Sequence, residues 1–331
     1  MKKALKATLI GVGAVAATAG LYKLITEQIN RTFAKGALDR EVPVFMEKLN
    51  MMPDGYDLDD EVVQSAAKGQ ERLETQPLET VTIESFDGTR LVGHLYRSPN
   101  QKRVMLAMHG WRSEWSRDFG VVSAFWEGQD CSVLYVEQRG QGLSDGEYMG
   151  FGMLERKDCI AWIEWLNQNG FDAAPIYLVG LSMGASSVLM AAGDANLPKN
   201  VCGVIADCGF TSAGAIWKHV IETNYKLPYR FHGKGMNRLC NDRIQMSPDE
   251  YSTIDAMKVT RTPVLFIHGD ADGFVPVEMS IENYEACVAP KKLLIVSGAD
   301  HGLSYLVDRE RYERTVCKFF EAHDGDVQKE E

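Results

Sequence analysis

Short apolar runs alternate with stretches of helical spacing along most of the chain. Eight runs have the length and the branched or alternating composition of strands, and they lie near 80–86, 90–97, 103–108, 131–136, 176–179, 201–206, 263–268 and 292–296. Helices are expected near 115–127, 154–168, 183–193, 278–288 and 307–322. This order predicts an eight-stranded, mostly parallel sheet with helices on both faces. The Asp87-Gly88 turn between the first two runs predicts an antiparallel hairpin at one edge.

The fifth predicted strand meets a helix at Gly180-Leu181-Ser182-Met183-Gly184. A sharp turn from strand to helix needs small residues on both sides, and it holds the serine hydroxyl out over the edge of the sheet. Ser182 is therefore the candidate nucleophile. A serine also needs a histidine to take its proton and a carboxylate to orient that histidine, and both are expected downstream.

His301 is the candidate base among the seven histidines. It lies in a loop just after the strand predicted at 292–296, where open α/β sheets place their chemistry. The other six have different settings: His94 lies within a strand, His109 and His268 end strands and precede glycines, His219 and His232 lie in an insertion, and His323 lies in the charged tail.

The stretch from His268 to Pro276 follows the seventh predicted strand and offers two aspartates, Asp270 and Asp272. The order Ser182, Asp272, His301 and the run His-Gly-x-x-Asp-x-x-Val-Pro resemble the α/β-hydrolase superfamily. Within it, the similarity is to prolyl-oligopeptidase-like and bile-acid acyltransferase-like serine hydrolases, some of them membrane-anchored bacterial proteins. The resemblance covers roughly residues 80 to 322. It implies the α/β-hydrolase fold and makes Asp272 the triad acid, with Asp207 as a competing acid after the sixth strand.

The resemblance also points to an oxyanion hole, two backbone N–H groups that face the oxygen that becomes negative during acyl transfer. By position these belong to Trp111, after the third strand, and to Met183, at the start of the helix after Ser182. Trp111 departs from the small residue that many relatives have here. Its indole is expected either to form a wall of an acyl pocket or simply to pack beside the turn.

Residues 211–259, between the sixth and seventh strands, form an insertion that the sheet does not need. We expect a helical lid over Ser182. From 211 to 243 its charged residues are Lys218, Lys226, Arg230, Lys234, Arg238 and Arg243 against Glu222 and Asp242. The whole chain carries −11, so this local basic excess fits a lid that faces an anionic substrate or membrane, or equally a solvated helical face.

The N-terminus has the charge pattern of a membrane segment. Three lysines precede sixteen uncharged residues, Ala7 to Tyr22. The stretch is short for a bilayer and fits a cleaved signal peptide or a marginal anchor. An apolar stripe continues to Phe33 and favours an anchor and juxtamembrane helix over residues 1–35, with the hydrolase domain at 36–325 outside the membrane and a charged tail at 326–331.

The seven cysteines do not suit an oxidising compartment, because their number is odd and most fall in predicted strands or on apolar helix faces. A cytoplasmic location therefore stays open beside anchoring and secretion. None of them has the spacing of a zinc site, and no cofactor or metal is expected. The acidic chain also argues against nucleic-acid binding.

These features predict a serine hydrolase that cleaves a carboxylic ester, or in second place an amide, through an acyl-enzyme. An aminopeptidase or an acyltransferase of the same fold is the enzymatic alternative. A non-catalytic binding protein of this fold is another, although an intact Ser182, Asp272 and His301 set argues against it. The substrate is expected to be a small-molecule ester or peptide, and no pattern indicates the oligomeric state.

Overall fold

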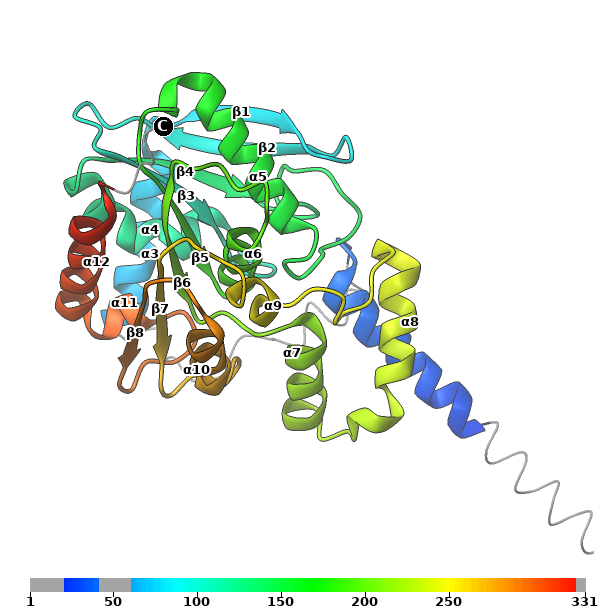
Figure 1. Cartoon of the computed structure of the whole chain (residues 1–331). Coiled ribbons are helices and arrows are strands. Elements are labelled where there is room, and N and C mark those ends of the chain that lie inside the picture. Colours follow the sequence, from blue (N-terminus) through cyan, green and yellow to red (C-terminus); the bar gives the residue numbers. More distant parts are fainter. Residues whose placement is uncertain (1–20, 42–60, 326–331) are drawn as a thin grey trace, which may run out of the picture.

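The computed structural model describes residues 21–41 and 61–325. Its centre is an eight-stranded sheet in the order β1-β2-β4-β3-β5-β6-β7-β8 (Figure 1). The strands are β1 (Glu79–Glu84), β2 (Arg90–Tyr96), β3 (Arg103–Met108), β4 (Cys131–Glu137), β5 (Ile176–Leu181), β6 (Val201–Asp207), β7 (Val264–Gly269) and β8 (Lys291–Val296). β2 pairs antiparallel with both β1 and β4, and all other pairs are parallel. The predicted α/β-hydrolase sheet is confirmed.

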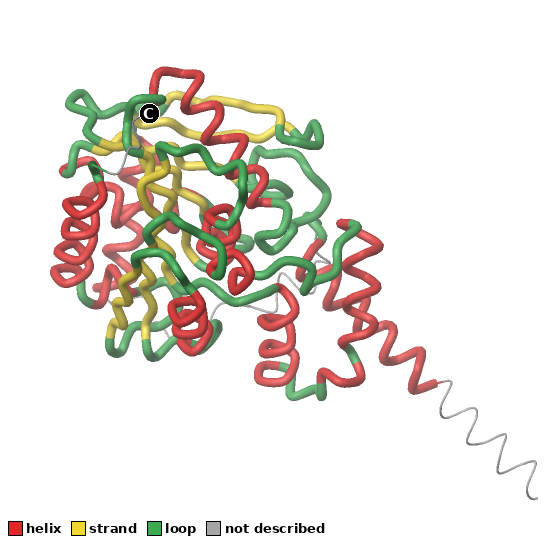
Figure 2. Tube along the Cα trace, in the orientation of Figure 1, coloured by secondary structure: helices red, strands yellow, loops and turns green. Residues whose placement is uncertain are grey.

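Helices cover both faces of this sheet (Figure 2). One face packs against α3 (Glu61–Thr75), α4 (Trp115–Gly128), α11 (Ser304–Val307) and α12 (Arg309–His323). The other packs against α5 (Glu155–Leu166), α6 (Met183–Ala192), α9 (Thr253–Met257) and α10 (Val277–Ala286). The central strands β3 and β4 are buried along their whole length, which is why they appear in the sequence as continuous apolar runs.

Helix α3 was not expected from the sequence. Leu73 is the only fully buried residue of this helix, and its other apolar residues are partly or wholly exposed. Its contact with α4 depends instead on Gly69 and Gly120, which allow the two backbones to touch. A Cβ atom on Gly69 would lie 2.7 Å from the Val121 nitrogen, and one on Gly120 would lie 2.5 Å from the Gln70 nitrogen. A helix that is amphipathic in its sequence was thus missed, and the glycine contact that places it against α4 could not be predicted from the sequence.

The insertion between β6 and β7 contains α7 (Ala213–His219), a π-helical turn η2 (Val220–Asn224), a 3₁₀ turn η3 (Tyr229–Phe231) and α8 (Gly233–Ile244). Its last helix, α9, packs against α6 in the body of the fold. A helix over residues 21–38 lies alongside α8 (Figure 1) and buries Ala34 and Leu38 completely. This helix is continuous across residue 35, the boundary predicted between anchor and hydrolase domain.

Most of the predicted membrane segment, residues 7–20, lies outside the described residues. Among the described helices, none combines the length and the apolar character needed to span a bilayer. The anchor therefore stays a prediction.

Candidate active site

Ser182 lies at the turn between β5 and α6, and its backbone is strained there. Its φ of 54° and ψ of −116° fall in a region that glycine normally occupies. The flanking Gly180 and Gly184 are required because a Cβ atom on either would collide with backbone, that of Gly184 and of Met108 respectively. The Ser182 amide donates to the carbonyl oxygen of Asp207, 2.9 Å away, which ties the turn to the end of β6.

The structure brings Ser182, His301 and Asp272 together, as their order in the sequence predicted. Nε2 of His301 lies 3.0 Å from the Ser182 hydroxyl, and Nδ1 lies 2.7 Å from Oδ2 of Asp272. Because a carboxylate accepts hydrogen bonds, Nδ1 carries the proton and Nε2 is free to receive the serine proton. The Ser182 residue is 6% exposed and the Asp272 side chain is fully buried.

Asp272 is held as an ionised, well-oriented carboxylate. Burial raises the pKa of this carboxyl, but hydrogen bonds from His268 and His301 outweigh burial, and the pKa lies well below its usual range. Oδ1 accepts hydrogen bonds from the amides of Phe274 and Val275, each 2.8 Å away. These two bonds fix the carboxylate so that Oδ2 faces the histidines.

Asp207, the competing acid, has a different setting. Its Oδ1 accepts a hydrogen bond from the Ser304 hydroxyl at 3.0 Å, and no hydrogen bond joins it to His301 in the described part of the chain. Burial raises the pKa of this carboxyl to about 6, against the opposing effect of His268 and of the Ser304 hydrogen bond. The geometry thus favours Asp272 as the partner of His301.

His268 is a residue whose contribution the sequence reasoning missed. It was interpreted as a strand-end residue, and it does lie near the end of β7, but its buried ring also contacts the candidate acid. Nε2 lies 3.1 Å from Oδ2 of Asp272 and 2.9 Å from the carbonyl oxygen of Val275, so this nitrogen must donate. Nδ1 then accepts from the Ser280 hydroxyl, 2.6 Å away. The spacing of four residues between His268 and Asp272 was the only available signal.

The two predicted oxyanion donors are the backbone amides of Met183, at the start of α6, and of Trp111, on the loop after β3. Met183 begins α6, so its amide has no acceptor within the helix. On the loop after β3, the amide of Gly110 donates to the Asp118 carboxylate and that of Arg112 to the Gln141 side chain, both at 2.6 Å. The amide of Trp111 between them is the one left for a substrate oxygen, and its role stays a prediction.

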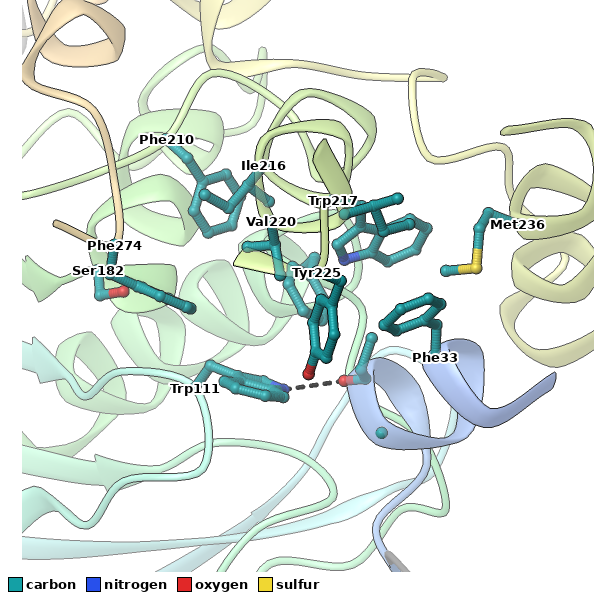
Figure 3. A pocket seen from close by; sticks show the side chains of 14 residues that line it. Phe33, Trp111, Ser182, Phe210, Ile216, Trp217, Val220, Tyr225, Met236 and Phe274 are labelled. Carbon is teal, nitrogen blue, oxygen red and sulfur yellow. Dashed lines mark hydrogen bonds between the residues drawn. The ribbon is translucent and has the colours of Figure 1, made fainter. Parts of the chain in front are cut away.

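An apolar cavity opens beside Ser182 (Figure 3). The empty space here, counted together with the open solvent at the mouth, is about 610 Å³. Aromatic walls come from the loop after β3, the body of the fold and the insertion between β6 and β7: Trp111, Phe151, Phe210, Trp217, Tyr225 and Phe274. None of the described residues that line the cavity is charged. The Trp111 indole is thus a pocket wall, one of the two roles expected for it.

One group of possible metal ligands occurs among the described residues: Cys208, Asp272 and His301, with ligand atoms within 4.8 Å of one another. Two of these residues are already hydrogen-bonded to each other. Burial raises the pKa of the Cys208 thiol well above its usual value, which disfavours the thiolate as long as no metal ion is bound. The arrangement suits proton transfer better than metal binding.

Comparisons with known proteins agree with this fold. The chain is 28% identical over 190 residues to YqkD of Bacillus subtilis, described only as uncharacterised, a match that covers 57% of this chain and 62% of that protein, just under two thirds of its length. It is 25% identical to the protein bem46 of Schizosaccharomyces pombe over 67% of each chain.

Solved structures show the same fold. The Pyrococcus furiosus esterase Pf2001 superposes with a TM-score of 0.62 at 23% identity, covering 77% of this chain and 94% of that one. Est1E of Butyrivibrio proteoclasticus, solved with ferulic acid, gives a TM-score of 0.54 at 19% identity, with 73% and 98% covered. The prolyl oligopeptidase family model matches residues 118–326, more than half of the sequence. The chain therefore belongs to the prolyl oligopeptidase family and is an α/β-hydrolase enzyme.

Proposed function

We propose that this enzyme cleaves carboxylic esters with an apolar acyl group through an acyl-enzyme. The observation that carries the proposal is the hydrogen-bonded series Ser182, His301, Asp272 at one end of an uncharged cavity. Ser182 Oγ attacks the ester carbonyl while Nε2 of His301 takes its proton, and the same proton then passes to the departing alcohol. A water molecule then attacks the acyl-enzyme and gives a proton to Nε2 of His301. That proton passes to Ser182 Oγ as the carboxylic acid leaves.

The residues around the triad support each step. Asp272 stabilises the positive charge that His301 gains, because Oδ2 accepts from its Nδ1–H. The amides of Trp111 and Met183 are assigned to the developing oxyanion, where the N-terminus of α6 adds its positive dipole. The aromatic walls exclude water from the acyl group and strengthen these interactions.

A peptidase is the second candidate, because the family model that matches is that of prolyl oligopeptidases. An aminopeptidase has to bind the charged N-terminus of its peptide, and a carboxylate in the binding site is the strong partner for that ammonium group. No described residue that lines the cavity supplies one, which favours a neutral acyl group.

The proposal includes attachment to a membrane through residues 1–20, with the catalytic domain outside. The lysines and uncharged residues of that segment support attachment. At the start of the described helix, Leu21, Leu24 and Ile25 are all more than half exposed, which suits a helix that leaves an apolar environment there.

The direct test combines a fluorophosphonate probe, which reacts only with an activated serine, with p-nitrophenyl esters and aminoacyl p-nitroanilides of matched size. Labelling at Ser182 with ester turnover at least 100-fold above anilide turnover supports the esterase. Anilide turnover equal to or above ester turnover identifies a peptidase. Absence of labelling contradicts both.

A further inference from the structure

We propose that the helix of residues 21–38 is the outer wall of the acyl cavity and that Phe33 on it determines which acyl groups fit. The inference depends on the proposed function, because it assigns the acyl side of the same site. Three residues of this helix, Phe33, Gly36 and Ala37, line the cavity that also contains Ser182. The helix lies wholly before the part of the chain that matches the family model, residues 118–326, so this wall is additional to the family's matched region.

Specific polar contacts fix this helix against the lid. Both carboxylate oxygens of Glu27 accept hydrogen bonds from Arg238 of α8 at 2.7 Å. Asn30, which is 3% exposed, pairs with the equally buried His232 at 2.7 Å. Two buried polar side chains that satisfy each other specify one position of the helix, because either alone would be left without a partner.

The C-terminal end of the helix is joined to the oxyanion loop. The indole N–H of Trp111 donates to the carbonyl oxygen of Ala37 at 2.8 Å, a bond drawn in Figure 3. The Arg112 guanidinium donates to the carbonyl oxygen of Gly36 at 2.9 and 3.0 Å, and also to that of Asp39. The helix therefore supports the residue to which we assign an oxyanion amide, in addition to forming the cavity wall.

Phe33 lies at the end of the cavity away from the nucleophile. In Figure 3, Ser182 and Phe33 stand on opposite sides of the labelled set, and Phe33 packs against the apolar cluster that contains Trp217 and Met236. Its ring meets Tyr225 of the lid edge-to-face with a centroid distance of 4.6 Å. A short acyl group bound at Ser182 would not reach this ring, whereas a long one would end against it.

The experiment measures the length profile of the acyl site with two reagents. Full-length protein and its Phe33→Ala and Phe33→Trp variants are compared by kcat/KM on p-nitrophenyl esters from two to twelve acyl carbons, and by labelling rates with alkyl fluorophosphonates of the same lengths. Phe33→Ala should raise the ratio of long-chain to short-chain rates about tenfold, and Phe33→Trp should lower it about tenfold, the usual effect of a misfit in an apolar pocket.

The matched control is Phe231→Ala. Phe231 lies on η3 and is 46% exposed. Its ring packs near Tyr22 of the helix of residues 21–38, but Phe231 does not line the cavity. We expect this variant to keep the wild-type length profile. A profile that is unchanged in both Phe33 variants, or that shifts equally in the Phe231 variant, would overturn the inference.

The two reagents separate this inference from the proposed function. If the wild-type protein turns over no ester but its labelling profile shifts with Phe33, the esterase proposal fails and the wall is supported. If esters are turned over and neither profile responds to Phe33, the esterase proposal stands and the wall is refuted. If the protein reacts with neither reagent, Ser182 is not an activated nucleophile and both proposals fail.

Discussion

Replacing Asp272 by asparagine tests the orientation of the candidate base. Oδ1 of Asp272 accepts from two backbone amides, and Oδ2 accepts from both histidines. An asparagine has only one oxygen. We expect that oxygen to stay with the Phe274 and Val275 amides, because amide N–H groups cannot face each other, and the new NH₂ group then faces His301.

A hydrogen-bond donor at that position favours the opposite tautomer of His301. Nδ1 of His301 must become an acceptor, so its proton moves to Nε2, which can no longer take the proton of Ser182. A wrong tautomer of this kind costs about 10⁴ in turnover, equivalent to about 5.4 kcal/mol in the activation free energy. The structure gives no route by which His268 could restore the correct tautomer, because its Nε2 already donates to Val275.

The assay is kcat on the best p-nitrophenyl ester, with Asp207→Asn as the matched control. Asp207 is buried near the same turn, but its carboxylate accepts a hydrogen bond from Ser304. Its asparagine variant should therefore lose less than tenfold in kcat. Circular dichroism of both variants checks that the fold is kept. A loss below tenfold in folded Asp272→Asn, or a larger loss in Asp207→Asn, would contradict the assignment of the acid.

Four further outcomes are expected. Ser182→Ala should abolish fluorophosphonate labelling, read by mass spectrometry of the labelled peptide; labelling that persists elsewhere would show that another residue is the nucleophile. Burial raises the pKa of Asp207 to about 6, above its unfolded value, so its stabilising contribution is full at low pH and is lost as the pH rises from about 4 through 6. Asp207→Asn should therefore stabilise the protein at pH 8 by up to about 3 kcal/mol in the free energy of unfolding, and by less toward pH 4; denaturant titrations at several pH values that show no such trend would rule this out. Full-length protein should sediment with membranes at high salt, and removal of residues 1–20 should release it. If the lid also binds anionic lipid, the shortened protein should float with anionic vesicles at low salt and lose this binding on replacement of Lys226 and Lys234, exposed cations without a carboxylate partner among the described residues, by glutamine.

The strands and the nucleophile turn could be predicted because their signals are local. A buried parallel strand is a continuous apolar run, and the turn at Ser182 needs glycines at fixed spacing. Every strand of the structure overlaps a predicted run. The distances among Ser182, Asp272 and His301 follow from strand order, since all three lie at the carboxyl ends of parallel strands.

The remaining features depend on contacts distant in sequence. Glu27 and Arg238 are 211 residues apart, and nothing in either segment indicates the other. The helix of residues 21–38 was therefore interpreted only as a continuation of a membrane segment, although its inner face lines the cavity. The insertion could be recognised from its length alone. Its excess of basic residues is partly neutralised in the structure, because Arg238 pairs with Glu27 and Arg243 with Asp39. Both acidic partners lie outside the insertion.

The strained backbone at Ser182 sets activity against stability in a single residue. A non-glycine side chain at φ 54° and ψ −116° costs on the order of 1–3 kcal/mol, which other parts of the fold must offset. Glycine at this position would relieve the strain and remove the hydroxyl together. Selection for thermal resistance alone would thus favour loss of the candidate nucleophile, so a search for more stable variants of this protein has to select for activity at the same time.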